Sequence, residues 1–113
     1  MSAEKQASLK PGPVNRLVIY RPRKGHESDL AAILQKHGPT LRKSGLITDE
    51  PVEVWRATDL QYQGEPSRYF VETFQWRDEK ASDIAHQTPE VMAVWETMGP
   101  HLEEMTLTTL ERL

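Results

Sequence analysis

The chain has 113 residues, which suffices for one hydrophobic core but not for two independent ones. Hydrophobic residues make up 37% of it and charged residues 27%, so it is globular, and no apolar run approaches the roughly 20 residues of a membrane span or forms the core of a secretory signal. A net charge of −3 with scattered basic residues argues against a nucleic acid partner, and the absence of cysteine excludes thiol chemistry, so we expect a cytoplasmic protein.

The N-terminal segment predicts a tail followed by a strand. Residues 1–13 are polar or small and end in Pro-Gly-Pro, so we expect them to be disordered. Residues 14–21 are rich in β-branched and apolar side chains and are followed by Pro22, which predicts the first strand.

From His26 onwards the apolar residues recur at the spacing of an α-helix. Gly38 and Pro39 fall within this helix and should kink it, because proline cannot donate its backbone N–H. Gly45 is the expected stop signal. The positions that define the stripe are Leu30, Ile33, Leu34, His37 and Leu41.

The middle of the chain predicts a hairpin of two strands. Residues 51–58 alternate, and residues 68–76 carry large side chains on both faces, as in a strand covered on both sides. With Gly64 at the centre of the hairpin, Arg56 would lie opposite Glu72. Glu72 sits in an apolar strip and requires a partner there, so we expect an ion pair with Arg56. It is either a structural pair or part of a pocket that anchors a substrate.

The last third predicts a helix in two pieces and a final strand. Asp78 is a suitable N-cap for the first piece, and Thr88 followed by Pro89 marks the start of the second. Residues 105–113 are rich in threonine and favour a strand.

This order of elements predicts an α+β, ferredoxin-like βαββαβ domain over residues 14–113, with a four-stranded antiparallel sheet and both helices on one face. The other face would expose large apolar side chains of the central strand. A patch of that kind is larger than monomers usually tolerate, so we expect a homodimer formed through the sheet.

Several segments also resemble a known family. They are the NRLVIY strand at residues 15–20, the YFVETFQW strand at 69–76, and AHQTPEVMAVWETMGP at 85–100. With the element order, they resemble the dimeric α/β-barrel superfamily, and within it the antibiotic biosynthesis monooxygenase domains. The resemblance covers residues 14–113 and implies a homodimeric α/β barrel with a ligand cavity between the helices and the sheet.

Two histidines are candidate catalytic residues. His37 lies on the apolar stripe of the first helix, where it is either a core residue or a general base of near-neutral pKa. His86 lies beside the break in the second helix, where it either lines a pocket or caps the surface. Trp76, Trp95, Met98 and Tyr20 would form an apolar wall for a small apolar or aromatic ligand, or simply fill the core.

The resemblance implies two further roles. Some members are cofactor-free oxygenases, which deprotonate an aromatic substrate and let its carbanion reduce dioxygen, so no cofactor is expected. Asn15, Arg56 or the Trp95 N–H would then stabilise the oxyanion. Haem-degrading relatives use an asparagine on the first strand, which Asn15 matches, but the position of their haem-ligand histidine is occupied by Trp95 and Glu96. The alternative to an oxygenase is a non-catalytic ligand-binding or structural dimer.

No metal site is predicted. The histidines show no H-x-x-x-H pair and have no cysteine nearby, so no single element presents two histidine or cysteine ligands. A metal site would have to be assembled by tertiary contacts between distant residues. The four histidines are His26, His37, His86 and His101.

Overall fold

The structure, a computed structural model, describes residues 12–60, 63–64 and 67–113. Most of the predicted tail therefore lies outside the described residues. The elements are β1 (Val14–Pro22), α2 (Glu27–Lys43), β2 (Glu53–Thr58), β3 (Arg68–Trp76), α3 (Ala81–Ala85), α4 (Pro89–Met98), the 3₁₀ helix η1 (Gly99–His101) and β4 (Leu102–Leu110).

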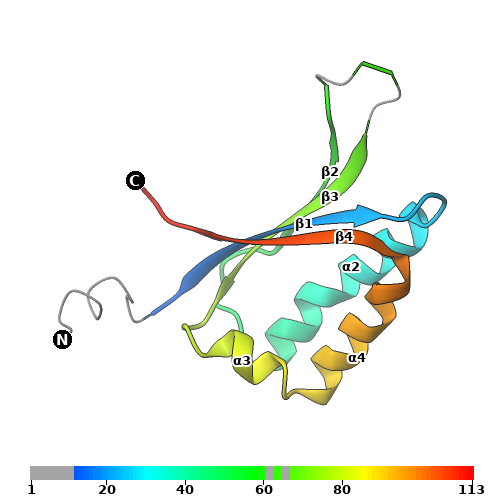
Figure 1. The fold of residues 1–113 in the computed structure, drawn as a ribbon. Helices are drawn as coiled ribbons and strands as arrows, with labels where there is room; N and C mark the ends of the chain where they lie inside the picture. The colour runs from blue at the N-terminus through cyan, green and yellow to red at the C-terminus, as the bar shows by residue number, and fades with distance from the viewer. Residues whose placement is uncertain (1–11, 61–62, 65–66) are drawn as a thin grey trace, which may run out of the picture.

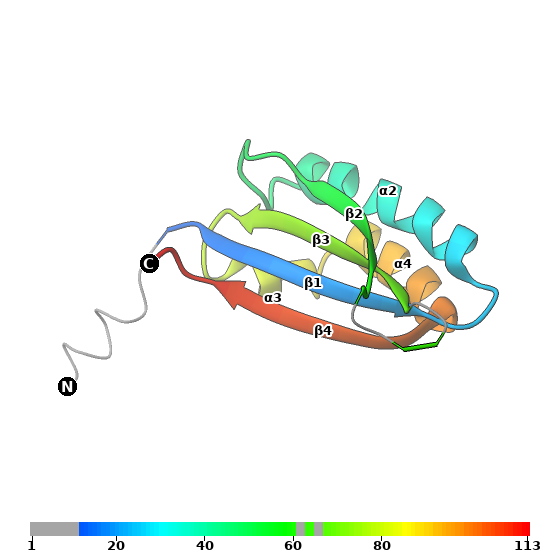
Figure 2. The same cartoon turned by 90° about the horizontal axis from the view of Figure 1, so that it is seen from above.

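One antiparallel sheet of four strands forms a layer over the helices, in the order β2-β3-β1-β4 (Figure 1). Every neighbouring pair of strands is antiparallel. Figure 2 shows this sheet from above, with α2 and α4 behind it and the near face free of helices. The predicted α+β, ferredoxin-like fold with a four-stranded antiparallel sheet is confirmed. No helix within the described ranges is long and apolar enough to cross a membrane.

The core lies between the sheet and the helices, because the strands and the helices both turn their apolar side chains to that side. In β3 the even-numbered residues Phe70 to Trp76 are buried and the odd-numbered ones are half-buried. The predicted stripe of α2 supplies the opposite surface through Leu30, Leu34 and Leu41, which are all fully buried. Val18 and Tyr20 of β1 and Val91 and Met98 of α4 complete this core.

The first helix is not interrupted at Gly38 and Pro39, since α2 runs from Glu27 to Lys43 as one element with Pro39 inside it, and the kink expected there stays a prediction. Gly38 permits a close approach: a Cβ built there would lie 2.9 Å from the Val52 Cγ1. Gly45, with φ of +72°, follows the helix end as predicted.

The second helix is divided into α3 and α4, as predicted, with Thr88 as the N-cap and Pro89 as the first residue of α4. The N-cap of α3 is Lys80, so the prediction of Asp78 was wrong by two residues. Asp78 forms the turn before the helix, where its carboxylate accepts a bond from the Lys80 N–H. The last strand lies three residues earlier than predicted, because it begins directly after η1.

Candidate functional site

An apolar cavity of about 310 Å³ lies between the helix-facing side of the sheet and the α3–α4 segment. Strands β1, β3 and β4 form one wall, and α2, α3, α4 and η1 contribute to the other. The strand residues are Arg16, Val18, Tyr20, Phe74, Trp76, Leu102, Met105 and Leu107, and the opposite wall holds His37, Ser82, His86, Trp95, Met98 and Gly99.

A chain of hydrogen bonds runs from the core to this cavity. Glu72 is fully buried, and both of its carboxylate oxygens lie 2.9 Å from the His37 Nδ1. The Tyr20 hydroxyl donates to the Glu72 Oε1 at 2.6 Å. On the other side of the imidazole, the Trp95 Nε1–H donates to the His37 Nε2 at 2.9 Å. We call Glu72, His37 and Trp95 the relay.

The donors fix the protonation state of the relay. The Trp95 indole can only donate, so the His37 Nε2 must accept and carries no proton. The remaining proton lies on Nδ1 and points at the Glu72 carboxylate, which makes His37 a neutral imidazole backed by an anion. Burial, followed by the nearby Glu72 charge, raises the pKa of Tyr20 far above its ordinary value. Tyr20 is therefore a permanent hydrogen-bond donor to Glu72.

His86 lies on the same wall of the cavity but in a different environment. Its Nδ1 lies 2.8 Å from the Ser82 carbonyl oxygen, to which it can only donate, so the Nε2 lone pair is left available. Its ring lies 4.8 Å from that of Trp95 between centroids, at 60°. His86 is exposed, whereas His37 is only 3% exposed, so one histidine of the cavity lies next to solvent and the other lies deep in the protein.

Two polar groups on the strand wall can donate hydrogen bonds to a ligand. Arg16 donates from its Nη1 to the Thr109 Oγ1 at 2.9 Å and places a cation beside the apolar surface. Trp76 is 4% exposed, and its Nε1 is the buried side-chain nitrogen that lacks a partner within the described part of the chain. An unpaired buried donor costs about 1–3 kcal/mol, which an acceptor reaching it from the cavity would recover.

Two predicted site residues lie elsewhere. Arg56 does not pair with Glu72: the hairpin register places Val54 opposite Glu72, and the Arg56 Nε bonds to the Glu27 carboxylate at 2.7 Å on the surface. The position of Arg56 was wrong because the hairpin centre is one residue earlier than Gly64. The expected ion pair is replaced by the bond that the His37 Nδ1–H donates to the Glu72 carboxylate.

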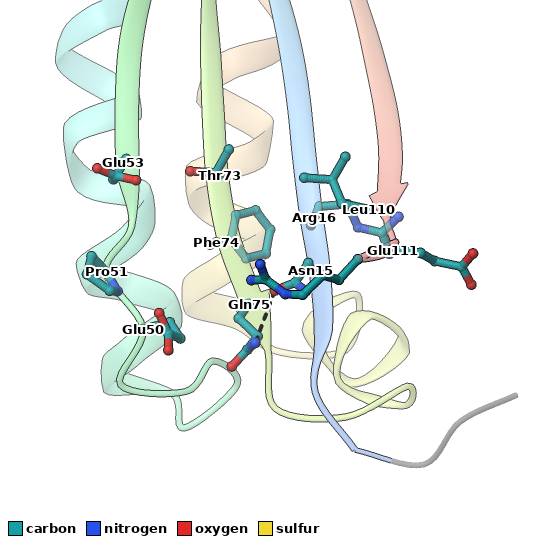
Figure 3. Close-up of a pocket in the computed structure, with 11 residues that line it drawn as sticks. Asn15, Arg16, Glu50, Pro51, Glu53, Thr73, Phe74, Gln75, Leu110 and Glu111 are labelled. Carbon is teal, nitrogen blue, oxygen red and sulfur yellow. Dashed lines mark hydrogen bonds between the residues drawn. The ribbon is translucent and has the colours of Figure 1, made fainter.

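Asn15 lies on the other face of the sheet, because it differs in parity from the cavity residue Tyr20 on the same strand. Its Oδ1 accepts a bond from the Gln75 Nε2 at 3.0 Å, shown as a dashed line in Figure 3. Both residues line a polar depression of about 300 Å³ near the end of β4. Asn15 therefore cannot act with His37.

The remaining predicted residues line the cavity, except Glu72, which lies behind His37 and Tyr20. The prediction missed the other lining residues, which are Arg16, Val18, Phe74, Ser82, Gly99, Leu102, Met105 and Leu107. Arg16 shares the parity of Val18 and Tyr20 and could have been found from it. Met105 and Leu107 could not have been found, because the residue pattern of the last strand does not indicate which of its faces turns towards the helices.

No protein-family model matches the chain, and no curated protein matches it. Solved structures share its fold. A dimeric protein of unknown function and ferredoxin-like fold from Bacteroides fragilis is 14% identical, with a TM-score of 0.68, covering 89% of this chain and 97% of the other. An antibiotic biosynthesis monooxygenase is 14% identical, with a TM-score of 0.66 and coverage of 88% and 98%.

A third similar structure is that of a mutant of SnoaB, a cofactor-independent oxygenase from Streptomyces nogalater. It is 13% identical, with a TM-score of 0.66, covering 90% of this chain and 96% of the other. The chain thus has the ferredoxin-like fold of the antibiotic biosynthesis monooxygenases, as its segments implied.

Proposed function

From the fold shared with the antibiotic biosynthesis monooxygenases, we propose that this chain binds a small aromatic compound in the helix–sheet cavity and oxidises it with dioxygen, without a cofactor. The observation that carries this proposal is the relay at the cavity wall. An imidazole that is buried, neutral and backed by a carboxylate is arranged to accept a proton and to be stabilised once charged.

His37 is the proposed base, because it is the histidine lining the cavity that donates a hydrogen bond to a buried carboxylate. When the substrate binds, the His37 Nε2 gives up its hydrogen bond from the Trp95 N–H and faces an acidic C–H or O–H of the substrate instead. The freed indole N–H then donates to the oxyanion, together with the Arg16 guanidinium. Met98, Trp76 and Phe74 keep the site apolar, so these charges interact strongly.

The reaction balances with dioxygen as the only co-reactant. A ring CH₂ activated by a phenol or ketone loses one proton to His37, and its carbanion gives its electrons to dioxygen and forms a C–O bond. The peroxide takes back the proton as C–OOH. Loss of the second C–H proton with the distal oxygen then releases water and leaves a carbonyl. One oxygen atom enters the product and the other leaves as water.

Oxygen uptake with a panel of polycyclic quinols and anthrones tests this proposal. His37→Gln should lower the rate by about 10²–10⁴-fold, as expected for loss of a general base. Glu72→Gln should lower it by about tenfold or more, because the anion that stabilises the imidazolium is removed. His86→Gln keeps the relay and should retain most of the activity. If His86→Gln loses the activity and His37→Gln keeps it, the assignment of the base is wrong.

A non-catalytic ligand-binding role is the second candidate, because both nitrogens of His37 already have partners and the residue is almost fully buried. It predicts that aromatic ligands bind, for example by quenching tryptophan fluorescence, while no quinol or anthrone in the panel consumes oxygen. Binding that is equal in the wild type and in His37→Gln would favour this role.

We also propose that a second copy of the chain covers the open face of the sheet. Trp55 is 57% exposed and Leu110 41% exposed there, and half-buried Leu17, Ile19 and Val71 lie between them. The similar structure from Bacteroides fragilis is described as dimeric. A dimer would close the α/β barrel expected from the sequence.

Light scattering after size exclusion measures the assembly. The wild type should be a dimer and Trp55→Glu a monomer, because a charge on that face would have to be buried. Ile84→Glu is the matched control, since Ile84 is a similarly apolar exposed residue on α3 and should leave the dimer intact. A wild-type monomer at micromolar concentration would refute the proposed dimer.

A further inference from the structure

Two histidines from distant segments meet at the end of the molecule where β1 leads into α2. His26 is the N-cap residue of α2 and His101 ends η1, so 75 positions separate them in the chain. Their Nδ1 atoms lie 2.9 Å apart. At that distance one nitrogen donates and the other accepts, so the two Nδ1 atoms face each other.

The backbone holds these two histidines in place. The Arg23 N–H donates to the His101 carbonyl at 2.9 Å, and the His26 N–H donates to the Arg23 carbonyl at 2.9 Å. The His26 carbonyl in turn accepts from the Leu30 N–H in the first turn of α2. Both histidines are half-buried, so their rings are also restrained by their surroundings.

A carboxylate completes the group. Asp29 lies one helical turn after His26, and the ligand atoms of Asp29, His26 and His101 all lie within 4.8 Å of one another. No hydrogen bond or ion pair to the Asp29 carboxylate is found among the described residues. Arg23, the cation three residues before His26, is engaged by the Glu103 carboxylate at 3.1 Å. Asp29 is therefore free to contribute its charge to the pair of imidazoles.

We propose that the His26, Asp29 and His101 side chains bind a divalent transition-metal ion of the Zn²⁺ class. Two imidazole nitrogens and one carboxylate oxygen suit such an ion and do not suit Mg²⁺ or Ca²⁺, which prefer oxygen ligands. Ligands about 2.0–2.2 Å from a tetrahedral ion lie roughly 3.3–3.5 Å apart. The two nitrogens separate by a few tenths of an ångström, and the exposed Asp29 side chain moves inwards. Water takes the fourth position.

The site would act on the cavity through η1. Gly99, two residues before His101, and Leu102, the residue after it, both line the helix–sheet cavity. An ion that joins His101 to the start of α2 would fix this part of the wall. It lies outside the relay, so it is a structural site whose occupancy does not depend on the proposed reaction.

Metal titration of the full chain without a polyhistidine tag tests the site. Co²⁺ should give the visible ligand-field bands of a four-coordinate ion, and Zn²⁺ should abolish them. The Zn²⁺ affinity measured by calorimetry should fall more than about tenfold in His101→Gln and His26→Gln, and also in Asp29→Asn. His86→Gln is the matched control, because it removes an exposed histidine elsewhere and should bind as the wild type does.

Thermal unfolding provides a second readout that does not require activity. Zn²⁺ should raise the unfolding midpoint of the wild type with increasing concentration, and should leave that of His101→Gln unchanged. Equal Zn²⁺ affinity in the wild type and His101→Gln, or no Co²⁺ bands in the wild type, would show that the two histidines form only a hydrogen bond and would overturn the proposal.

Discussion

Tyr20→Phe removes one of the two donors that hold the buried Glu72 carboxylate. Tyr20 is 2% exposed, and its hydroxyl lies 2.6 Å from the Glu72 Oε1, while His37 supplies the other donor. A hydrogen bond to a charged group contributes about 1.5–3 kcal/mol. The free energy of unfolding at neutral pH should fall by about that amount, as measured by urea denaturation.

The same substitution should change the alkaline limit of stability. Tyr20 stays protonated in the folded protein because its pKa is raised by burial and by Glu72, whereas in the unfolded chain it ionises near its ordinary value of 10.0. As the pH rises above that value, the unfolded state releases a proton that the folded state keeps. Stability should therefore fall with increasing steepness, and the slope from this residue approaches about 1.4 kcal/mol per pH unit once the unfolded-state tyrosine is fully ionised.

Urea unfolding between about pH 9 and pH 11 measures this slope. Tyr20→Phe should lack the Tyr20 contribution and show a shallower decline than the wild type. Tyr69→Phe is the matched control, because Tyr69 is half-buried on the open face beneath Arg21, whose Cζ lies 4.4 Å from the ring centroid. If the wild type and Tyr20→Phe decline equally, Tyr20 is not held neutral by Glu72 and burial.

Two further substitutions address packing and surface charge. Gly38→Ala should lower the free energy of unfolding by about 1 kcal/mol in urea denaturation, because overpacking against Val52 costs about 1–3 kcal/mol and outweighs the helix-propensity gain of about 1 kcal/mol. Gly99→Ala, with nothing within 4 Å of its Cβ, is the control, and a Gly38→Ala variant more stable than the wild type would contradict the close approach. Arg56→Ala removes an exposed pair with Glu27 and a guanidinium that lies 5.5 Å from the centroid of the Phe70 ring, and should cost less than about 1 kcal/mol by the same measurement. A larger loss would mean that Arg56 has a role in the core.

The local patterns in the sequence predicted most of the fold. A run of large side chains on both faces identified β3, with the bounds that the structure shows, and helical spacing placed His37 on the buried stripe of α2. The break before Pro89 was visible because threonine and proline act on the backbone within a few residues. These signals are local, so they do not depend on how the elements pack together.

The contacts between elements were harder to predict. The hairpin register shifted by two residues, since the hairpin loop contains no sequence signal that fixes its centre. The period of two nevertheless kept Arg56 and Glu72 on the same face. The partner of Glu72 depends on how α2 lies across the sheet, and nothing in the sequence specifies that the His37 Nδ1 reaches it. The pairing of His26 with His101 was invisible for the same reason.

The cavity wall contains two thioethers, those of Met98 and Met105. Methionine is converted to its sulfoxide by peroxides, which makes an apolar side chain polar. Peroxide that escaped from the proposed intermediate would meet these sulfur atoms first, and Met105 more readily, because it is 47% exposed while Met98 is 2% exposed. Sulfoxide accumulating at Met105 during turnover would thus record where in the molecule dioxygen had been reduced.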